Sequence, residues 1–502
     1  MSGIKKVLVA NRGEIAVRIM RTLHAMGIKT VAVYSEPDRD APHVELADEA
    51  FLIGPAPSRE SYLKIRTIIS TAKATGADAI HPGFGFLAEN PEFAQAVADA
   101  GLVFIGPTPS AIREMGNKLN SRALALKHDV PVIPAVDERD AGGDFLERVK
   151  KIGFPVLIKA AAGGGGKGMR VVERAEDLAK SLEMSKRESL NAFGDDHVFV
   201  EKYLLHPRHI EFQVLGDLHG NVMHLNEREC SIQRRHQKII EETPSPLMTD
   251  GLRAEMGAAA VRLAEAVRYS SAGTVEFMVD ANGKYYLLEM NTRLQVEHPV
   301  TEMTLGMDLV YWQVRIAEGQ PLTMRSAPLR ARGHAIECRI YAEDPAADFL
   351  PCAGRLAYLR EPSGPFIRND CGVRSGSEVT THYDPMISKL VAWGETREAS
   401  VARMKEALKD YVILGLRTNR EYLVDILDLP AFQQGKLHTG FLKEHLPNWQ
   451  PKQTNLEPAL IAAALFGKRA RRPAADPRGA GQSAAADKDG SNPWTTVGNW
   501  GR

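Results

Sequence analysis

The segment from Lys284 to His298, KYYLLEMNTRLQVEH, carries polar side chains at every second position after an apolar, strand-like start. In chain order, these polar residues are Glu289, Asn291, Arg293, Gln295 and Glu297. Because successive side chains of an extended chain point to opposite faces, the alternation predicts that all five project from one face. An acid, an amide, a cation, an amide and an acid suit neither an apolar core nor a solvated sheet edge. The segment therefore predicts a site for a metal ion and a small anion.

The preceding segment, Gly273–Asp280 (GTVEFMVD), also alternates, and the Asn282-Gly283 pair that follows is a hairpin turn signal. A two-residue loop at this pair places Glu276 opposite Glu289. Two carboxylates that face each other across a ladder repel, and a divalent cation such as Mg2+ between them removes the repulsion. Two exposed acids at a sheet edge are the alternative interpretation. The amide and the guanidinium that follow Glu289 favour the metal.

Composition excludes several classes of protein. The chain has 502 residues, enough for two to four domains, and its 63 basic residues balance 63 acidic ones. This balance argues against nucleic acid and anionic membranes as partners. The apolar run before Asn11 is too short for a signal peptide and no segment is long enough to span a bilayer, so we expect a soluble cytoplasmic protein. The four cysteines show no CxxC spacing, which argues against a zinc ribbon or a disulfide framework.

Strands and helices alternate in the first part of the chain. Lys6–Ala10 and Lys29–Tyr34 are predicted strands, and Glu14–Ala25 is a predicted helix between them. This order predicts a parallel, doubly wound sheet. A dinucleotide-binding domain is an alternative, but the turn after the first strand, Asn11–Glu14, lacks the G-x-G-x-x-G fingerprint of such domains.

A glycine-rich loop follows the predicted strand Phe154–Ala160. The loop, Gly163–Met169 (GGGGKGM), offers unhindered backbone N–H groups beside lysines, which favours phosphate binding. It is not a Walker A loop, because no G-K-[ST] opens a helix. A hairpin without a ligand is the alternative, and Lys159 at the end of the preceding strand favours the phosphate.

The stretch Glu229–Lys238 (ECSIQRRHQK) concentrates cationic side chains around two glutamines. It contains no aromatic residue for base stacking, so nucleic acid is a poor fit. These donors suit a small anion and a nucleotide phosphate.

Together these segments resemble the biotin carboxylase family of ATP-grasp enzymes, over roughly Ile4 to Leu446. The motifs that carry the resemblance are NRGEIA (Asn11–Ala16), HPGFGFLAEN (His81–Asn90), FIGP (Phe104–Pro107), KAAAGGGGKGM (Lys159–Met169), EKYL (Glu201–Leu204), PRHIEFQVLGD (Pro207–Asp217), ERECSIQRRHQK (Glu227–Lys238), EMNTRLQVEHPVTE (Glu289–Glu302) and GHAIECRIYAEDP (Gly333–Pro345). Each motif is weak alone, and their common order is specific.

The resemblance implies an α/β and α+β architecture: an ATP-grasp fold preceded by a doubly wound parallel-sheet domain and followed by a mixed C-terminal domain. The expected divisions are residues 1–117, residues 118–330 with a mobile lid at about 134–206, residues 331–449, and a flexible tail at 450–502. The tail is also expected from its composition, since residues 470–491 are rich in alanine, glycine and charge without periodicity.

The resemblance also implies the site residues. Those expected to bind ATP are Lys118, Lys159, Gly165, Gly166, Glu201, Lys202, Leu204, His209, Gln233 and His236. Those expected to bind Mg2+ or Mn2+ are Glu276, Glu289 and Asn291. Bicarbonate is expected at Lys238, Arg293, Gln295 and Val296, with Glu297 as the base that removes its proton. Arg339 is expected to face the ureido group of biotin.

The implied reaction joins ATP, bicarbonate and carrier-linked biotin to give ADP, phosphate and N-carboxybiotin through carboxyphosphate. Bicarbonate is a poor nucleophile, so a carboxylate base at Glu297 is required for its attack. Metal ions and lysines offset the charge on the transferred phosphoryl group, and Arg339 stabilises the biotin oxyanion. The implied partners are a biotin carboxyl carrier protein or domain, a second copy of the chain in a homodimer, and a carboxyltransferase subunit.

Three positions depart from the family pattern: Phe84, where tyrosine is frequent, Asn117, where aspartate is usual, and Ala162, which replaces a loop glycine. None is a metal or bicarbonate residue, so we expect activity to persist. The sequence contains no Ala/Val-Met-Lys-Met segment, so biotin is expected on a separate polypeptide, or the chain is cut short.

Two alternative functions remain at this point: another ATP-grasp ligase, and a non-catalytic ATP-binding subunit. The Arg293–Glu297 stretch and Arg339 argue against the first. The presence of a competent residue at every implied catalytic position argues against the second. The final carboxyl acceptor, an acyl-CoA or pyruvate, stays open.

Overall fold

The structure, a computed structural model, describes residues 3–141, 144–160, 169–323, 329–452, 457 and 460–461. The chain divides into two units, Met1–Gln450 and Pro451–Arg502, and the elements discussed below belong to the first. The predicted tail at 470–491 and the loop glycines Gly165 and Gly166 lie outside the described residues. Among the helices of the described chain, none is long and apolar enough to cross a membrane.

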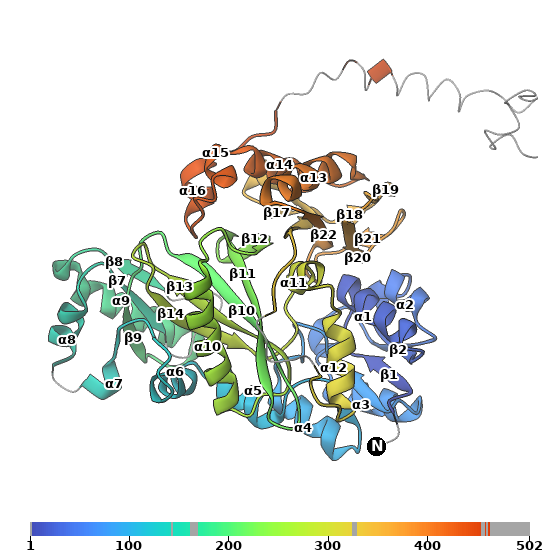
Figure 1. Cartoon of the computed structure of the whole chain (residues 1–502), viewed down its shortest axis with the longest axis horizontal. Coiled ribbons are helices and arrows are strands. Elements are labelled where there is room, and N and C mark those ends of the chain that lie inside the picture. Colours follow the sequence, from blue (N-terminus) through green and yellow to red (C-terminus); the bar gives the residue numbers. More distant parts are fainter. Residues whose placement is uncertain are drawn as a thin grey trace, which may run out of the picture. The chain divides into compact units, whose positions relative to one another are not determined.

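The N-terminal region is a five-stranded parallel sheet, as predicted (Figure 1). Its order is β3 (Glu49–Gly54), β2 (Lys29–Ser35), β1 (Lys6–Val9), β4 (Ala79–His81) and β5 (Val103–Phe104). Val7 and Val9 of β1 pack in one hydrophobic core with helix α1 (Gly13–Ala25), while Leu8 packs in another core with α3 (Ile65–Ala74) and α4 (Pro91–Asp99). Apolar residues on both faces of the strands thus produce a doubly wound sheet.

An eight-stranded antiparallel sheet forms the centre of the first unit. Its order is β14 (Tyr285–Asn291), β13 (Ser271–Val279), β10 (Arg208–Gly216), β11 (Val222–Arg234), β12 (Gln237–Thr243), β15 (His334–Tyr341), β22 (Met386–Gly394) and β20 (Ile367–Cys371). Helices α10 (Asp250–Ala266), α11 (His298–Leu305) and α13 (Arg397–Asp410) pack against it. Since β12 pairs directly with β15, the sheet continues from the ATP-grasp region into the C-terminal region.

A separate four-stranded sheet lies within the range expected for the lid. Its order is β6 (Ala135–Asp137), β9 (Val198–Lys202), β7 (Val156–Ala160) and β8 (Arg170–Val172), and α8 (Phe145–Ile152) and α9 (Leu178–Phe193) pack against it. A small apolar core of its own holds this sheet together. One point ties the chain just before this sheet to the large one: Leu287 N donates to Pro131 O at 2.7 Å, and Val132 bridges to Leu287.

The β13–β14 hairpin places Glu276 opposite Glu289, as predicted, but by a different route. Its turn is one residue longer than the predicted two-residue loop, because Val279 pairs with Tyr285. An irregularity next to Glu276 restores the register. The two carboxylates are therefore cross-strand neighbours.

The remaining elements of the described chain are short. They are α2 (Pro42–Leu46), α5 (Pro109–Gly116), α6 (Lys118–Lys127), α7 (Glu138–Ala141), α12 (Leu309–Ala317), α14 (Arg420–Asp428), α15 (Pro430–Gln433), α16 (Phe441–His445), β16 (Glu343–Asp344), β17 (Leu350–Pro351), β18 (Gly354–Arg355), β19 (Tyr358–Arg360), β21 (Glu378–Val379), β23 (Val412–Leu414) and the 3-10 turns η1 (Glu36–Asp38), η2 (Ser58–Glu60), η4 (Ala175–Asp177) and η5 (Pro345–Ala347).

Candidate active site

Lys238, at the start of β12, is the centre of a buried charge cluster on the large sheet. Its Nζ donates to Glu211 at 2.5 Å, to Glu276 at 2.8 Å and to Glu297 at 2.7 Å. These carboxylates come from β10, from β13 and from the turn before α11. Burial opposes the charge of Lys238, but the three carboxylates outweigh burial and raise its pKa well above the ordinary value. Lys238 is therefore a permanent cation that holds three segments of the chain together.

The Glu276 carboxylate, predicted to bind metal, collects donors from four directions. Besides Lys238, Asn291 Nδ2 and Gln295 Nε2 each donate to it at 2.8 Å, and His209 Nε2 lies 2.9 Å away. Burial alone would raise the pKa of Glu276, but Lys238 and His209 lower it far below the ordinary value. The carboxylate is thus ionised at any physiological pH.

The predicted metal residues fit a hard cation. Glu276 and Glu289 are cross-strand partners, and Asn291 lies two residues further along β14. Two carboxylates and an amide oxygen are the few protein ligands that Mg2+ takes when phosphate oxygens and water complete its shell. A bound Mg2+ supplies charge stabilisation to the phosphates of ATP.

The alternation that predicted one polar face holds only as far as Asn291, so that part of the prediction was wrong. Strand β14 ends at Asn291, and the following residues form an irregular loop into α11. Arg293 nevertheless returns to the site, because it donates to Asn291 Oδ1 at 2.9 Å and to Gln295 Oε1 at 2.8 Å. Hydrogen bonds between the side chains, not strand geometry, bring these residues together.

Glu297, the predicted base, lies between two cations. Lys238 Nζ donates to its Oε1 at 2.7 Å, and Arg339 Nη2 donates to its Oε2 at 3.0 Å. Burial raises its pKa, but Lys238 and then Arg339 outweigh burial and hold the pKa well below the ordinary value. Glu297 is therefore unprotonated and able to accept a proton. The predicted residues Lys238, Glu297 and Arg339 meet in one place.

Arg339, on β15, also donates to Glu241 Oε1 at 2.6 Å through Nε. Glu241 adds a fourth carboxylate to the cluster, against the three cations Arg228, Lys238 and Arg339. Burial raises the pKa of Glu241 to about 7, although Arg339 opposes this. One proton held by the carboxylates brings the charges close to balance.

A second buried lysine connects the loop to the N-terminal region. Lys389 Nζ donates to the backbone oxygen of Val296 at 2.9 Å and lies 3.2 Å from Glu14 Oε2. Glu14 belongs to the NRGEIA motif at the start of α1. That motif therefore supports the bicarbonate loop from a distance, and Val296 is held by its backbone.

A cavity of about 360 Å³ lies between the four-stranded sheet and β14. Lys159 and Glu201 line it from the small sheet and form a 2.5 Å ion pair, while Glu289 and Asn291 line it from β14. The volume falls in the range of about 300–1,000 Å³ typical of ligand sites. Two predicted ATP residues and two predicted metal residues thus share one cavity.

The other predicted nucleotide residues are placed less uniformly. His209 joins the cluster, and Gln233 Nε2 lies 2.7 Å from its Nδ1. The Lys202 ammonium donates to the backbone oxygens of Gly153 and Phe154 at 3.0 and 2.9 Å, so the side chain of Lys202 serves the small sheet.

Three further nucleotide residues lie apart from the cluster. Leu204 is half-buried in the connector after β9. His236 is exposed in a two-residue turn between β11 and β12, with φ 67. Lys118 begins α6, and its side chain is outside the described part.

Sequence reasoning missed Glu211, Arg228, Glu241 and Glu89. Glu211 Oε1 accepts from Arg228 Nε at 2.6 Å, and both side chains are fully buried. Glu89 accepts from Arg293 Nε at 2.7 Å and so orients that guanidinium. A signal existed for Glu211, since His209, Glu211 and Gln213 alternate with apolar residues along one strand. Glu241 joins the site through β15, far along the chain, so no local pattern marks it.

Three family models match the chain. They are the biotin carboxylase N-terminal domain at residues 3–112, the ATP-binding domain of the carbamoyl-phosphate synthase L chain at residues 117–325, and the biotin carboxylase C-terminal domain at residues 337–444.

Similar proteins span several carboxylases. The alpha chain of the mitochondrial methylcrotonoyl-CoA carboxylase of Dictyostelium discoideum is 49% identical over 99% of this chain and 70% of its own length. One component of the pyruvate carboxylase of Methanothermobacter thermautotrophicus is 52% identical over 88% of this chain and 90% of its own. The chain spans 60–70% of the length of the methylcrotonoyl-CoA carboxylase alpha chains of Dictyostelium, mouse, rat and rice.

A solved structure shares the fold. It is the biotin carboxylase domain dimer of the Hydrogenobacter thermophilus 2-oxoglutarate carboxylase, in complex with MgADP, ADP and bicarbonate. The similarity has a TM-score of 0.85 and 44% identity, and it covers 90% of this chain and 100% of the other. With the buried cluster and the family matches, it establishes that the chain belongs to the biotin carboxylase family, the ATP-dependent ligases that carboxylate biotin with bicarbonate.

Proposed function

We propose that this chain performs the first half-reaction of an acyl-CoA carboxylase, the carboxylation of carrier-linked biotin, and that Glu297 is its base. The position of Glu297 between Lys238 and Arg339 carries the proposal. Bicarbonate that enters between these cations comes within reach of a carboxylate already stripped of its proton. The same cations then offset the charge of the bicarbonate dianion.

The proposed division of labour follows the geometry. Lys159 and Glu201 bind ATP in the cavity, together with the other predicted nucleotide residues, and Glu276, Glu289 and Asn291 hold the metal. Arg293, Gln295 and the backbone of Val296 position bicarbonate. Arg339, released from Glu297 by a proton, stabilises the oxyanion of biotin formed from carboxyphosphate breakdown.

Replacing Glu297 tests the proposal. ATP cleavage by the unmodified chain is expected to depend on both bicarbonate and free biotin. Glu297→Gln is expected to lower that dependent rate by about 10²–10⁴-fold, the usual contribution of a general base, while ATP binding persists. Glu406→Gln, on an exposed face of α13, is the matched control and should leave the rate unchanged. A Glu297→Gln enzyme with full bicarbonate-dependent turnover would refute the role.

The acyl-CoA acceptor rests on similarity to methylcrotonoyl-CoA carboxylases, and the pyruvate carboxylase relative defines the alternative. We propose three partners: a separate biotin carrier, a carboxyltransferase, and a second copy in a homodimer, the last supported by the dimer of the similar structure. Purified carboxybiotin carrier, offered methylcrotonoyl-CoA, propionyl-CoA and pyruvate with the co-purifying transferase, separates the acceptors. Mass photometry of the chain tests the dimer.

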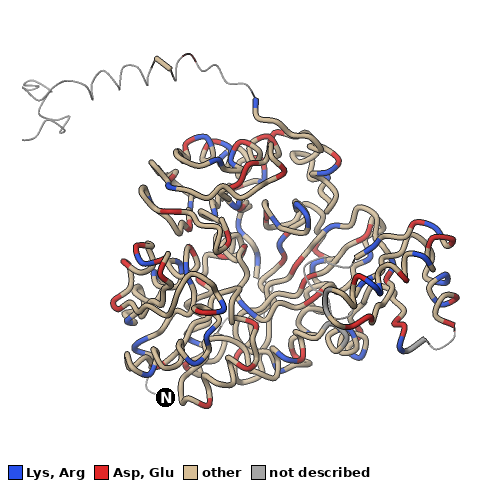
Figure 2. The backbone as a smooth tube through the Cα atoms, turned by 180° about the vertical axis from the view of Figure 1, so that it is seen from behind, with Lys and Arg blue, Asp and Glu red and all other residues tan. Residues whose placement is uncertain are grey.

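The proposed location is the cytoplasm. All four cysteines are free thiols, which suits a reducing compartment. Acidic and basic residues are interspersed along the described backbone (Figure 2), consistent with the expectation of no nucleic-acid partner. Cell fractionation checks the location.

A further inference from the structure

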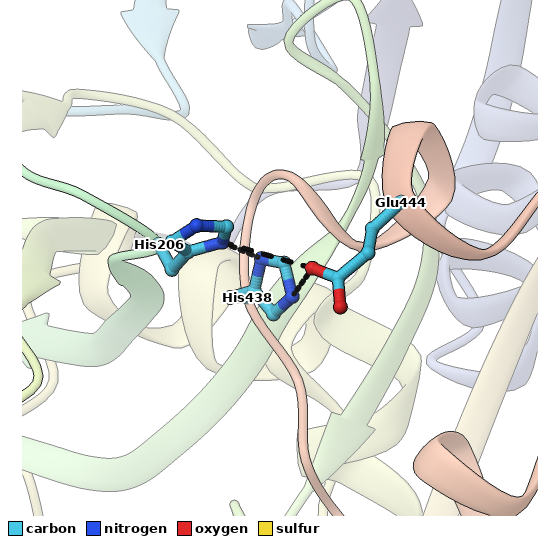
Figure 3. A group of neighbouring side chains, drawn as sticks. All are labelled: His206, His438 and Glu444. Carbon is cyan, nitrogen blue, oxygen red and sulfur yellow. Dashed lines mark hydrogen bonds and ion pairs between the residues drawn. The ribbon is translucent and has the colours of Figure 1, made fainter. Parts of the chain in front are cut away.

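Two histidines and a glutamate meet outside the catalytic cluster, as Figure 3 shows. His206 lies in the connector between β9 and β10, His438 precedes α16, and Glu444 lies on α16. A backbone hydrogen bond from Thr439 N to Pro207 O, 2.9 Å long, holds the two segments together. The three side chains therefore come from parts of the chain that are far apart in sequence but fixed side by side.

The two rings present nitrogens at the spacing of a metal-chelating pair. His206 Nδ1 lies 3.2 Å from His438 Nδ1. Two imidazole nitrogens bound to one zinc ion at about 2.0–2.1 Å, with a tetrahedral angle between them, lie about 3.3–3.4 Å apart. An ion can thus bind both nitrogens with a small adjustment of either ring.

The protonation pattern of His438 suits such an ion. Gly440 N donates to its Nδ1 at 3.2 Å, so the lone pair is on Nδ1 and the proton on Nε2. Nε2 faces Glu444 Oε2 at 3.1 Å. A carboxylate at the distal nitrogen is the usual device that orients a metal-binding histidine. Burial, and then His206, lower the pKa of His438, which favours the neutral ring that metals bind.

The surroundings leave room for water to complete the coordination. The His206 side chain is 63% exposed and that of Glu444 is 52% exposed, while His438 is 14% exposed. Glu444 Oε2 lies 3.9 Å from His206 Nδ1, close enough to offset the charge of an ion bound between the rings. Imidazole ligands favour zinc, copper, nickel and cobalt over magnesium, which prefers oxygen.

We propose that His206 and His438 bind a divalent transition-metal ion of the zinc class, and that Glu444 orients His438 and offsets the charge of the ion. The site differs from the magnesium site of the catalytic cluster in both its residues and its ligand chemistry. A bound ion fastens the connector that leaves the four-stranded sheet to the segment before α16.

The test uses the full chain without an affinity tag, stripped of metal and free of nucleotide. Zn2+ binding is measured by calorimetry, and Co2+ binding by visible absorption. His206→Asn removes one nitrogen ligand at an exposed position, and asparagine tolerates the left-handed backbone of this residue, φ 47. We expect Glu444→Gln to weaken Zn2+ binding by about tenfold or more. His206→Asn should weaken it further.

Two more variants isolate the site from other histidines and from the buried carboxylates. His382→Ala removes an exposed histidine elsewhere and should bind Zn2+ like the unmodified chain. Gly440→Ala keeps every ligand but places a Cβ 3.3 Å from His438 Nδ1 and 3.7 Å from His206 Nδ1, so it should crowd the ion and weaken binding. Equal Zn2+ affinity of His206→Asn and the unmodified chain would overturn the proposal. So would a zinc anomalous signal in crystals that lies away from His438.

Discussion

The eight-stranded and the four-stranded sheet treat charged side chains in opposite ways. In the large sheet, Glu211 and Arg228 are fully buried and bonded to each other, and Lys238 binds three carboxylates at once. In the small sheet and its helices, pairs such as Arg170–Glu188 are single and open to water, with side chains 32% and 53% exposed. Charges in the large sheet are costly to disturb, whereas charges in the small sheet are nearly neutral to stability.

The cores of the two sheets differ in the same sense. Strands of the large sheet reach several hydrophobic clusters, shared with α10, α13 and α14. The small sheet has only the compact cluster around Val149, Ile158 and Val200. Regions with few buried apolar contacts open at lower free energy. The reacting groups are thus built on the rigid sheet, and ATP is covered by the one that can open by itself.

Loss of the central cation should give the largest effect. Lys238→Gln leaves Glu211, Glu276 and Glu297 buried without their shared partner, so we expect a loss of about 3–5 kcal/mol in the free energy of unfolding, together with loss of bicarbonate-dependent ATP cleavage. Urea denaturation followed by tryptophan fluorescence measures the stability. Lys150→Gln breaks an exposed pair beside the small sheet and should change stability by less than about 1 kcal/mol. Equal effects of the two variants would contradict the contrast between the sheets.

The buried acids of the large sheet should make stability depend on pH. Glu241 and Glu337 are cross-strand partners, and among the described residues neither Glu337 oxygen has a hydrogen-bond partner. Burial raises the pKa of Glu337 well above its ordinary value and that of Glu241 to about 7. The folded state therefore binds more protons than the unfolded state above the ordinary glutamate pKa, and stability falls as pH rises from there through 7.

Glu337→Gln removes one of these protonation sites and should reduce that fall. We expect unmodified protein to lose about 2–3 kcal/mol more than the variant between pH 5 and pH 8, at about 1.4 kcal/mol per pKa unit. Thermal unfolding midpoints at several pH values measure the difference. Parallel pH profiles for the two proteins would show that Glu337 is not a proton carrier in this range.

A methyl deletion in each core should separate local from global opening. Ile158→Val in the small sheet and Ile336→Val in the large sheet each remove one methyl group from a fully buried side chain. Each is expected to cost about 0.5–1.5 kcal/mol. Hydrogen exchange should quicken only in β6–β9 for Ile158→Val, but across the large sheet for Ile336→Val. Faster exchange everywhere in both variants would mean that the two sheets open as one unit.

The smallest effect should come from a surface pair. Arg170→Ala removes the partner of Glu188 on the small sheet, and we expect a change of about 0–1 kcal/mol that vanishes in high salt. Denaturation with and without added salt measures it. A loss that persists at high salt would indicate that the pair holds more than solvent-exposed charge.

Local patterns predicted the strands well and predicted the site in part. The N-terminal alternation gave β1 and β2 to within one residue of their observed ends. The facing of Glu276 and Glu289 was predicted correctly, although the loop was one residue longer and an irregular step compensated for it. Alternation failed after Asn291, because the chain leaves the strand where its side chains begin to bond to each other. Glu241 depends on the pairing of β12 with β15, two strands far apart in the chain, which no period within a strand encodes.

The bridge between Leu287 and residues 131–132 has a mechanical consequence. The chain enters the four-stranded sheet just after this point, and Glu289 lies two residues beyond Leu287. Any swing of the small sheet therefore turns on an axle fastened to the metal-binding strand itself. Such an axle lets the cover travel far at its outer helices while its inner end stays still. The place where phosphate meets metal is thus nearly the fixed point of the motion.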